Sequence, residues 1–449
     1  MACDTSSLLP LLSPGSTIDS SPAQPLRWSE YAAPQPGSVV HPATPEDVQA
    51  IVKWANERHI PFLAQSGGNG WATTFKLQHD GIIIHLDLLR SVTFNPAGTE
   101  ATIGGGALIS DVVAAAAAKQ SLTLTGICNC VGALGALLGG GFSNLMGQYG
   151  LAIDDLLSLA VVKADGRAVT VTPADPDLWW AMRGAGPNFG IVTSAVLRAH
   201  PVAEKSDLTA WTGPLTFDPA KLEAVVDAIQ NLELSPEMSL SLHFINAGRP
   251  VVLTTLFYHG SAAAGRAAFA PLFDIGPLAE QLAELPYESW NNGSNIACMK
   301  GGRRPVWAAG LAHLDAAAWR NVYDIWAELI AQPGAERSSM LCNIQPTAKA
   351  RALPDASSAY PFRSTVRFHA GLTVAYRDAA FDATAQRYGE KVRAMWQATD
   401  GLARRSTYIN NAHGDETLET VYGDSLERLR TIKREHDPEG RFNEWFPLS

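Results

Sequence analysis

Basic clusters, long apolar runs and cysteines are scarce in this chain of 449 residues. No apolar run approaches the roughly 20 residues of a membrane-spanning helix, so no such helix is expected. The net charge is −10 without any basic block, which argues against nucleic acid or a membrane surface as a partner. No glycine cluster ends in the Gly-Lys-Ser/Thr of a phosphate-binding loop, which excludes that class of nucleotide-binding protein.

The cysteines are few and odd in number: Cys3, Cys128, Cys130, Cys298 and Cys342. The N-terminus, MACDTSSLLPLLSPGS, lacks a basic start and has only a short apolar run, so we expect no secretory signal and a cytoplasmic protein. A disulfide framework is then not expected, and a small buried thiol is the first interpretation of each cysteine. Cys128 and Cys130 form a C-x-C pair, but no nearby Cys/His pair completes a zinc site, so no metal is predicted.

Glycine is abundant in two otherwise apolar segments. Residues 126–150, GICNCVGALGALLGGGFSNLMGQYG, have glycine at eight of twenty-five positions, and residues 61–71 read PFLAQSGGNGW. Glycine allows the backbone to approach a flat or anionic ligand closely and to direct its N–H groups toward it. The two segments together predict loops that wrap a nucleotide cofactor.

A Rossmann fingerprint is the competing interpretation of a third cluster, Gly104 to Gly106. This cluster follows a strand-like run and precedes a helical pattern, as that motif requires. Ile109, however, stands where the last glycine should be, so the match is weak.

These segments resemble the flavin-linked oxidases of the berberine bridge enzyme type, whose fold is shared with vanillyl alcohol oxidase and p-cresol methylhydroxylase. The similarity covers roughly the first 200 residues and returns in the C-terminal YINNAHGDETLETVYGDSLERLRTIKREHDPEGRFNEWFP, which resembles fungal members of secondary metabolism. The resemblance implies an α+β fold with a two-subdomain FAD-binding domain of the p-cresol methylhydroxylase (PCMH) type and an antiparallel substrate sheet backed by helices. The implied divisions are an N-terminal extension (1–32), the FAD domain (33–201), the substrate domain (202–404) and a returning segment (405–449).

The resemblance also implies FAD and how it is attached. Bicovalent members bind the flavin through sulfur in the pattern Gly-x-Cys-x-x-Val-Gly, which places Cys128 at the attachment point. Most members read Arg-Ser-Gly-Gly-His in the first loop and use the histidine as the second attachment, whereas residues 65–69 read QSGGN here. The Asn69 amide cannot form that bond, so we expect FAD to be noncovalent or attached through Cys128 only.

Further cofactor contacts are carried over from family motifs. RGAGPNFGIVT contributes Asn188 and neighbours, although Pro187 stands where the family has glycine, and Asp154 corresponds to an acid near the adenine, with turn capping equally open. The predicted cofactor set is Ser66, Gly67, Gly68, Asn69, Gly70, Gly126, Cys128, Val131, Gly132, Gly135, Gly139, Gly140, Tyr149, Gly150, Asp154, Asn188, Gly190, Val192 and Asn410.

The sequence does not retain the tyrosines that serve as the catalytic base in members of this family. Two tyrosines that serve as bases in family members correspond to Phe142 and Asn411 here. His369 is the best titratable replacement, because it follows AYPFR (residues 359–363), which resembles the family's Ala-Phe-Pro-x-Arg. The predicted catalytic residues are His369, Gln345, Asn343 and Tyr408, of which Asn343 and Gln345 should face the same side of a strand.

Hydrophobic periodicity predicts the main elements. A capped helix should begin at residues 44–47, a buried strand should span 82–89, and a hairpin should turn at 164–167. In the substrate domain, strands are expected at 240–246, 251–259, 339–345 and 364–374, and helices at 222–232 and 317–329.

Two functions are consistent with these residues. The first is an FAD-dependent oxidase or dehydrogenase that transfers hydride from a small, hydrophobic natural product to flavin N5, with O2 as acceptor. The second is a redox-neutral isomerase or cyclase in which the flavin is structural or lost. A binding protein without catalysis is the third and least favoured interpretation. The chain is expected to be a monomer or a homodimer.

Overall fold

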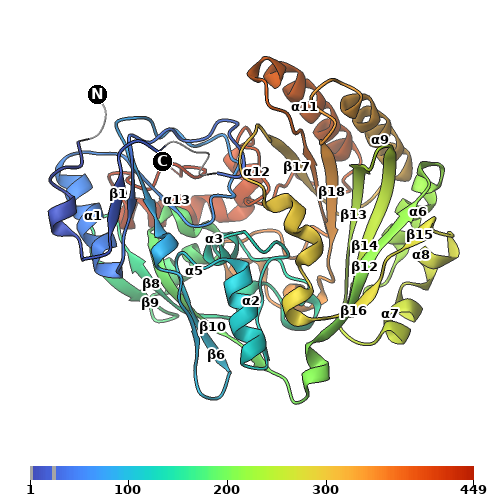
Figure 1. Ribbon diagram of the computed structural model, residues 1–449, viewed down its shortest axis with the longest axis horizontal. Coiled ribbons are helices and arrows are strands. Elements are labelled where there is room, and N and C mark those ends of the chain that lie inside the picture. Colours follow the sequence, from blue (N-terminus) through green and yellow to red (C-terminus); the bar gives the residue numbers. More distant parts are fainter. Residues whose placement is uncertain (1–3, 23–26, 449) are drawn as a thin grey trace.

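The computed structural model describes residues 4–22 and 27–448. Most of their strands belong to three large sheets (Figure 1). Two of these sheets lie in the N-terminal half of the chain, and the third lies beside them. Every pairing in the second and third sheets is antiparallel, whereas the first sheet is mixed. The predicted α+β fold class is confirmed.

The first sheet has the strand order β1-β2-β4-β3 and is covered by α1. As predicted, α1 begins with a capping box, because Thr44 Oγ1 accepts from Asp47 N at 3.2 Å and Asp47 Oδ2 accepts from Thr44 N at 2.8 Å. The strand expected at residues 82–89 ends at His85, since the chain turns into a short 3-10 helix. The bounds are β1 Thr17–Asp19, β2 Ser38–His41, β3 Phe62–Gln65, β4 Ile82–His85 and α1 Pro45–Glu57.

The second sheet, in the order β5-β6-β10-β8-β9, shares one hydrophobic core with the helices beside it and with the C-terminal helices. The predicted hairpin at 164–167 connects β8 and β9. The C-terminal helix α13 packs against α5, so the end of the chain returns to the N-terminal half. The bounds are β5 Val92–Phe94, β6 Glu100–Gly104, β8 Leu156–Val162, β9 Ala168–Val171, β10 Ile191–Arg198, α2 Ile109–Ala118, α3 Ala133–Leu138, α5 Pro176–Ala185, α12 Leu418–Tyr422 and α13 Leu426–His436.

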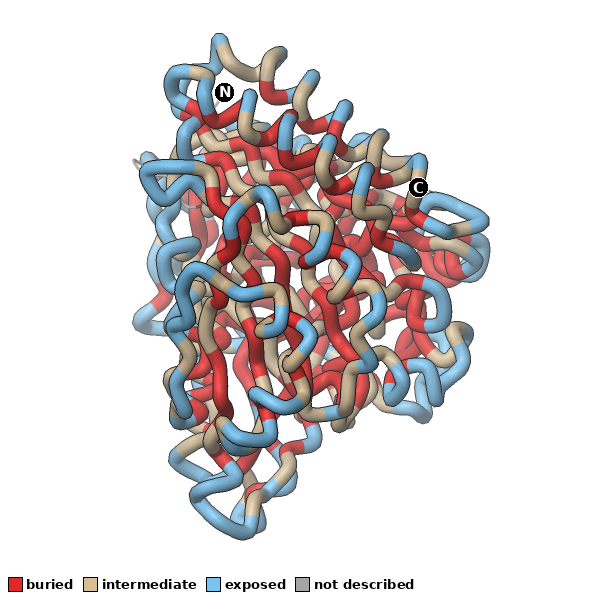
Figure 2. The backbone as a smooth tube through the Cα atoms, turned by 90° about the vertical axis from the view of Figure 1, so that its right-hand side faces the viewer, coloured by how far each residue is buried: buried red, intermediate tan, exposed pale blue. Residues whose placement is uncertain are grey.

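The third sheet, the substrate sheet, runs in the order β15-β12-β14-β13-β18-β19-β17, and β16 also pairs with β12. Alternation along β13 buries Leu240, Leu242 and Phe244 in a core with the outer helices and turns Ser241 and His243 to the opposite face. These outer helices are α6, α9 and α11, and each buries the side that faces the sheet and exposes the other side (Figure 2). The bounds are β12 Thr209–Phe217, β13 Met238–Asn246, β14 Pro250–Tyr258, β15 Ala279–Glu280, β16 Ala283–Pro286, β17 Val306–Leu311, β18 Ser339–Ile344, β19 Phe368–Thr373, α6 Leu222–Asn231, α9 Ala316–Ile330 and α11 Asp382–Ala398.

The expected strands and helices of the substrate sheet are confirmed with small shifts. The strand expected from residue 364 begins at Phe368, and Gln345 lies just beyond the end of β18. Within the described ranges, no helix is both long and apolar enough to cross a membrane. The shorter elements are β7 Ser121–Leu122, β11 His200–Pro201, α4 Met146–Tyr149, α7 Ala262–Ala268, α8 Ala270–Asp274 and α10 Ala348–Arg351.

Candidate active site

The two glycine-rich loops meet backbone to backbone. A Cβ on Gly67 would lie 2.6 Å from Gly132 N, and a Cβ on Gly132 would lie 2.5 Å from Ser66 Oγ and 2.8 Å from Gly67 N. The Asn69 amide, oriented to satisfy its neighbours, donates to the carbonyls of Cys130 and Gly67 at 3.1 Å. The structure therefore brings together two segments that the sequence predicts as one cofactor site, and only glycine fits at their contact.

The turn at Gly139 to Gly141, which belongs to the second glycine segment, is hydrogen-bonded to Tyr408 and packs against Asn410. Gly141 N donates to Tyr408 Oη at 3.2 Å, and Asn410 Nδ2 donates to Tyr408 Oη at 2.7 Å and to Ala136 O at 2.8 Å. Gly140 and Gly141 have φ of 143° and 76°, a region that L side chains rarely adopt. Burial raises the pKa of Tyr408 to about 12. The phenol thus stays protonated at neutral pH and supports the turn.

The catalytic candidates meet on the face of the substrate sheet that turns away from the outer helices. Asn343 is paired with Ser241 on one side and with His369 on the other, so these three side chains share that face. The His369 ring lies 4.5 Å from the Phe142 ring and 5.7 Å from the Tyr408 ring, between centroids. His369 and Gln345 line an enclosed cavity together with Phe142, Met146, Leu151, Thr347, Tyr360, Phe362, Arg363, Val366 and Arg367.

A larger hollow lies elsewhere, beside the C-terminal segment. It is lined by polar and apolar residues of three segments: Pro61, then Lys76, Leu77, Gln78, His79 and Asp80, and finally Asn443, Glu444 and Pro447. None of the predicted site residues lines it. Of the two hollows, the smaller one is therefore the one lined by catalytic candidates, namely His369 and Gln345.

Several buried polar atoms at this site have no protein partner. Ser66 Oγ belongs to the first glycine loop, Asn188 Oδ1 lies beside the C-terminal segment, and Asn343 Oδ1 and His369 Nδ1 lie on the substrate sheet. A buried polar group without a partner costs about 1–3 kcal/mol, so such groups mark places where a ligand supplies the missing hydrogen bonds. The glycine cradle and these atoms fit a dinucleotide such as FAD with a polar substrate group beside it.

The pKa of His369 is strongly lowered by burial, to about 3, and burial lowers the pKa of His243 to about 4. Both imidazoles are therefore neutral at physiological pH. A group with so low a pKa is a weak base. His369 therefore does not have the pKa near neutrality that a general base needs.

These pKa values predict acid destabilisation. Both folded-state values lie below the ordinary 6.5, so the unfolded chain binds protons that the folded protein does not, and stability falls as pH drops below about 6.5. Each such histidine contributes up to about 1.4 kcal/mol per pH unit. We expect His369→Gln to reduce the loss of unfolding free energy between pH 6 and pH 4 by about 1 kcal/mol per unit. Urea unfolding across this range measures the slope, and His313→Gln, at an exposed position, is the control. Parallel curves for wild type and His369→Gln would contradict the buried neutral state.

Asp154, a predicted cofactor residue, pairs with Arg363. Its two carboxylate oxygens each accept from an Arg363 guanidinium nitrogen at 2.8 Å, and Asp154 Oδ2 also accepts from Leu151 N at 3.1 Å. The side chain of Arg363 is fully buried and that of Asp154 is 8% exposed. The sequence contains no local sign of this pair, since 209 residues separate its members, and AYPFR indicates only that Arg363 belongs to a family motif.

The remaining predicted cofactor residues lie in different parts of the N-terminal half of the structure. Asn188 Nδ2 donates to Tyr422 Oη at 2.9 Å and to Trp445 O at 3.1 Å, which ties it to the returning segment. Tyr149 stacks on His200 with ring centroids 3.7 Å apart. The other positions are backbone or packing sites around the loops, namely Gly68, Gly70, Gly126, Val131, Gly135, Gly150, Gly190 and Val192. Their contacts with a cofactor stay predictions.

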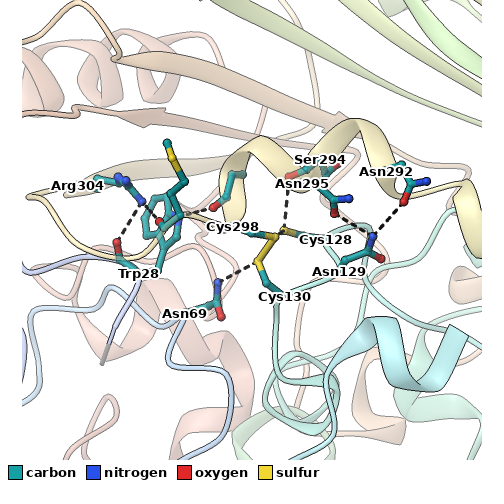
Figure 3. The surroundings of a disulfide bond; sticks show 12 residues. Trp28, Asn69, Cys128, Asn129, Cys130, Asn292, Ser294, Asn295, Cys298 and Arg304 are labelled. Carbon is teal, nitrogen blue, oxygen red and sulfur yellow. Dashed lines mark hydrogen bonds between the residues drawn. A yellow bond between two sulfur atoms is a disulfide. The ribbon is translucent and has the colours of Figure 1, made fainter. Parts of the chain in front are cut away.

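The expectation that the chain forms no disulfide is wrong. Cys130 and Cys298 form a disulfide with Cα atoms 5.6 Å apart, whereas Cys128 and Cys342 are free. The partner of Cys130 lies 168 residues away in a 3-10 segment, Asn292–Cys298, that folds onto the second glycine loop (Figure 3). Sequence spacing alone cannot show such a pairing. Cys342 is buried in the substrate-sheet core, as expected of a small thiol, and Cys3 lies outside the described residues.

Two glycine loops in backbone contact, in an α+β fold with an antiparallel substrate sheet, fit the FAD cradle expected of a flavin-dependent oxidoreductase. The sequence profile of the FAD binding domain matches residues 36–172, and that described as berberine and berberine like matches residues 407–445. The chain is 35% identical over 430 residues to FAD-linked oxidoreductase OXR1 of Pyricularia oryzae, covering 92% of this chain and 84% of that protein. It belongs to this family of FAD-linked oxidoreductases with a berberine-like C-terminus, which confirms the predicted resemblance.

Solved structures show the same fold at low sequence identity. BBE-like 1 of Physcomitrella patens has a TM-score of 0.86 at 19% identity, with 99% of each chain covered. Xylooligosaccharide oxidase of Myceliophthora thermophila, solved with xylobiose, has a TM-score of 0.83 at 21% identity, with 96% of each chain covered. The fold is therefore shared along nearly the whole chain.

Proposed function

We propose that this protein is an FAD-dependent oxidase of a small, hydrophobic natural product, with O2 as the acceptor. The observation that carries the proposal is that the second glycine segment, which contacts the first loop at Gly132, also reaches the substrate sheet through Phe142. Asn343 and His369 have unpartnered polar atoms on that face of the sheet. Related structures include enzymes named as carbohydrate oxidases. The wall of the cavity here combines apolar side chains such as Phe142 and Met146 with polar ones such as Gln345, which favours a substrate with an apolar part.

The protein's part in the reaction is to bind and orient the substrate. When bound, FAD supplies the hydride acceptor and the site of reoxidation by O2. Asn343 Oδ1 accepts a hydrogen bond from a substrate hydroxyl or amine, and His369 Nδ1 accepts another in the tautomer that keeps the proton on Nε2. The Phe142 ring packs against His369 and limits its movement. The substrate is thereby held by hydrogen bonds and by apolar walls that exclude water.

A redox-neutral reaction is the second candidate, and the state of the titratable groups favours it. The Tyr408 hydroxyl is engaged by Gly141 N and Asn410, and burial raises its pKa to about 12. Burial lowers the pKa of His369 to about 3. Neither group is tuned to take a proton at neutral pH, whereas the proposed oxidation of an alcohol would need a base for the hydroxyl proton.

The visible absorption spectrum of the purified protein distinguishes these candidates. We expect a flavin band that moves to the supernatant on acid precipitation, because no histidine stands in the first loop. Colour retained in the pellet of wild type but not of Cys128→Ser would establish attachment through that sulfur. Anaerobic bleaching by a substrate, followed by peroxide formation on admission of air, supports the oxidase. A flavoprotein that converts substrate without bleaching supports the redox-neutral reaction.

The role of His369 predicts a modest kinetic effect. His369→Gln is expected to lower kcat/KM about 10-fold, the effect of losing one well-placed hydrogen bond of about 1.4 kcal/mol. A general base would cost about 100-fold or more. Steady-state kinetics with the identified substrate measure the change, and His313→Gln, at an exposed position, is the matched control. A loss of 100-fold or more would contradict a purely positioning role.

A further inference from the structure

Three sulfur atoms from two distant parts of the chain converge beside the cofactor loops (Figure 3). Cys128 Sγ lies 3.6 Å from Cys130 Sγ and 3.8 Å from Cys298 Sγ, and the latter two form the disulfide. All three residues are partly exposed. None of the three cysteines lines the cavity of His369 and Gln345, although Cys128 belongs to the predicted cofactor set.

The arrangement does not suit thiol–disulfide exchange. A thiolate attacks a disulfide along the axis of the bond, through a linear arrangement of three sulfurs. Cys128 Sγ is almost equally distant from both sulfurs of the bond, so it lies to the side of the bond and not on its axis. The three sulfurs instead form a compact triangle, with all of them within 4.8 Å of one another.

We propose that the reduced cluster is a thiolate site for zinc or a similar thiophilic divalent ion, held by Cys128, Cys130 and Cys298. Zn–S bonds of about 2.3 Å in tetrahedral geometry place the sulfurs about 3.8 Å apart. Cys128 already lies at these distances from both partners. Once the disulfide is reduced, separation of Cys130 Sγ and Cys298 Sγ to the same distance completes the triangle.

The segment that supplies Cys298 is able to make this adjustment. Most of Asn292–Cys298 is exposed and it contributes no residue to the buried cores. Its contacts with the second glycine loop are polar: Asn129 Nδ2 donates to Asn295 Oδ1 at 2.9 Å, and Cys128 Sγ donates to Ser294 O at 4.0 Å. Because the three residues are partly exposed, water can reach a fourth position, as in zinc sites with three protein ligands.

The chemistry balances with a dithiol as reductant. The dithiol gives two electrons and two protons to the Cys130–Cys298 bond and becomes a disulfide itself, which leaves three thiols. The metal ion then displaces three protons and binds three thiolates, with a net charge of −1. Because Cys128 is a ligand, the metal-bound form excludes attachment of the flavin through that sulfur. The inference does not rest on the proposed function.

Cobalt binding tests the site. The full-length protein is reduced with a dithiol, transferred anaerobically to metal-free buffer and titrated with Co2+. We expect a thiolate-to-cobalt charge-transfer band that saturates at one equivalent, disappears on addition of Zn2+, and is accompanied by release of three protons. Cys298→Ser and Cys128→Ser should each weaken binding about 100-fold, as expected when one of three ligands is lost. Cys342→Ala, which removes the free thiol in the substrate-sheet core, should change neither the band nor the stoichiometry.

The Cys128→Ser variant also shows whether weaker cobalt binding results from loss of a metal ligand or from loss of folded structure. It leaves the Cys130–Cys298 bond intact, so the oxidised variant should unfold at the same temperature as the oxidised wild type. Cobalt bound equally well by Cys128→Ser and wild type would overturn the three-sulfur site. Absence of the band from the reduced wild type, or a disulfide that resists the dithiol in the folded protein, would overturn it as well.

Discussion

Alanine at position 132 is expected to leave the purified protein almost free of FAD. The new Cβ would lie 2.5 Å from Ser66 Oγ and 2.8 Å from Gly67 N, inside the contact between the two loops that form the cradle. Overpacking of this kind costs about 1–3 kcal/mol, and here the loops relieve it by moving apart. Since the cradle exists only while the loops touch, we expect FAD affinity to fall about 100-fold. Flavin absorbance per protein and titration of the apoprotein with FAD measure the loss.

The matched control is Gly293→Ala. Gly293 is exposed and no atom lies within 4 Å of its added Cβ, so this variant should bind FAD like the wild type. Circular dichroism should show both variants folded, because the change at Gly132 affects the loops and not the sheets. A folded Gly132→Ala protein with full flavin content would show that the loop contact is not needed for the cradle.

Loss of the Asp154 carboxylate is expected to give the largest change in stability. Asp154→Asn keeps one oxygen that can accept from Arg363 but leaves this fully buried guanidinium without its counter-charge. The other hydrogen-bond partners of Arg363 are neutral: Ser358 Oγ at 3.0 Å and Ala350 O at 3.3 Å. Removing one member of a buried ion pair costs about 3–5 kcal/mol. Asp154 also accepts from Leu151 N, so the pair connects the segment after the second glycine loop with the wall of the cavity. Urea unfolding at pH 7 measures the change.

An exposed pair of the same geometry provides the control. Arg404 and Asp424 also form two hydrogen bonds of 2.8 Å, but their side chains are 69% and 85% exposed. Asp424→Asn should not measurably change the unfolding midpoint, because water solvates both groups. The double variant Asp154→Leu with Arg363→Met should recover most of the stability lost in Asp154→Asn, since it leaves no buried charge. Equal effects of Asp154→Asn and Asp424→Asn would show that burial does not matter at this pair.

Local signals in the sequence determined much of the fold. The capping box at Thr44 and Asp47, the hairpin at residues 164–167 and the alternation along β13 each depend on residues within a few positions of one another. Helix caps, turns and strand alternation arise from short-range sterics and hydrogen bonds, so they can be inferred before the fold is known. The dense glycines likewise indicate loops in close contact with a ligand, whatever their partners are.

The sequence by itself thus determined the family and the fold class, and it indicated the two glycine loops that the structure brings into contact. Only the tertiary structure decided which distant groups meet: Cys130 with Cys298, and Asp154 with Arg363. It also decided that His369, chosen as a titratable candidate base, is buried beside Phe142 with its pKa far below neutrality. Pairing across 168 or 209 residues and the desolvation of a side chain depend on how whole sheets pack, and no local pattern of residues records them.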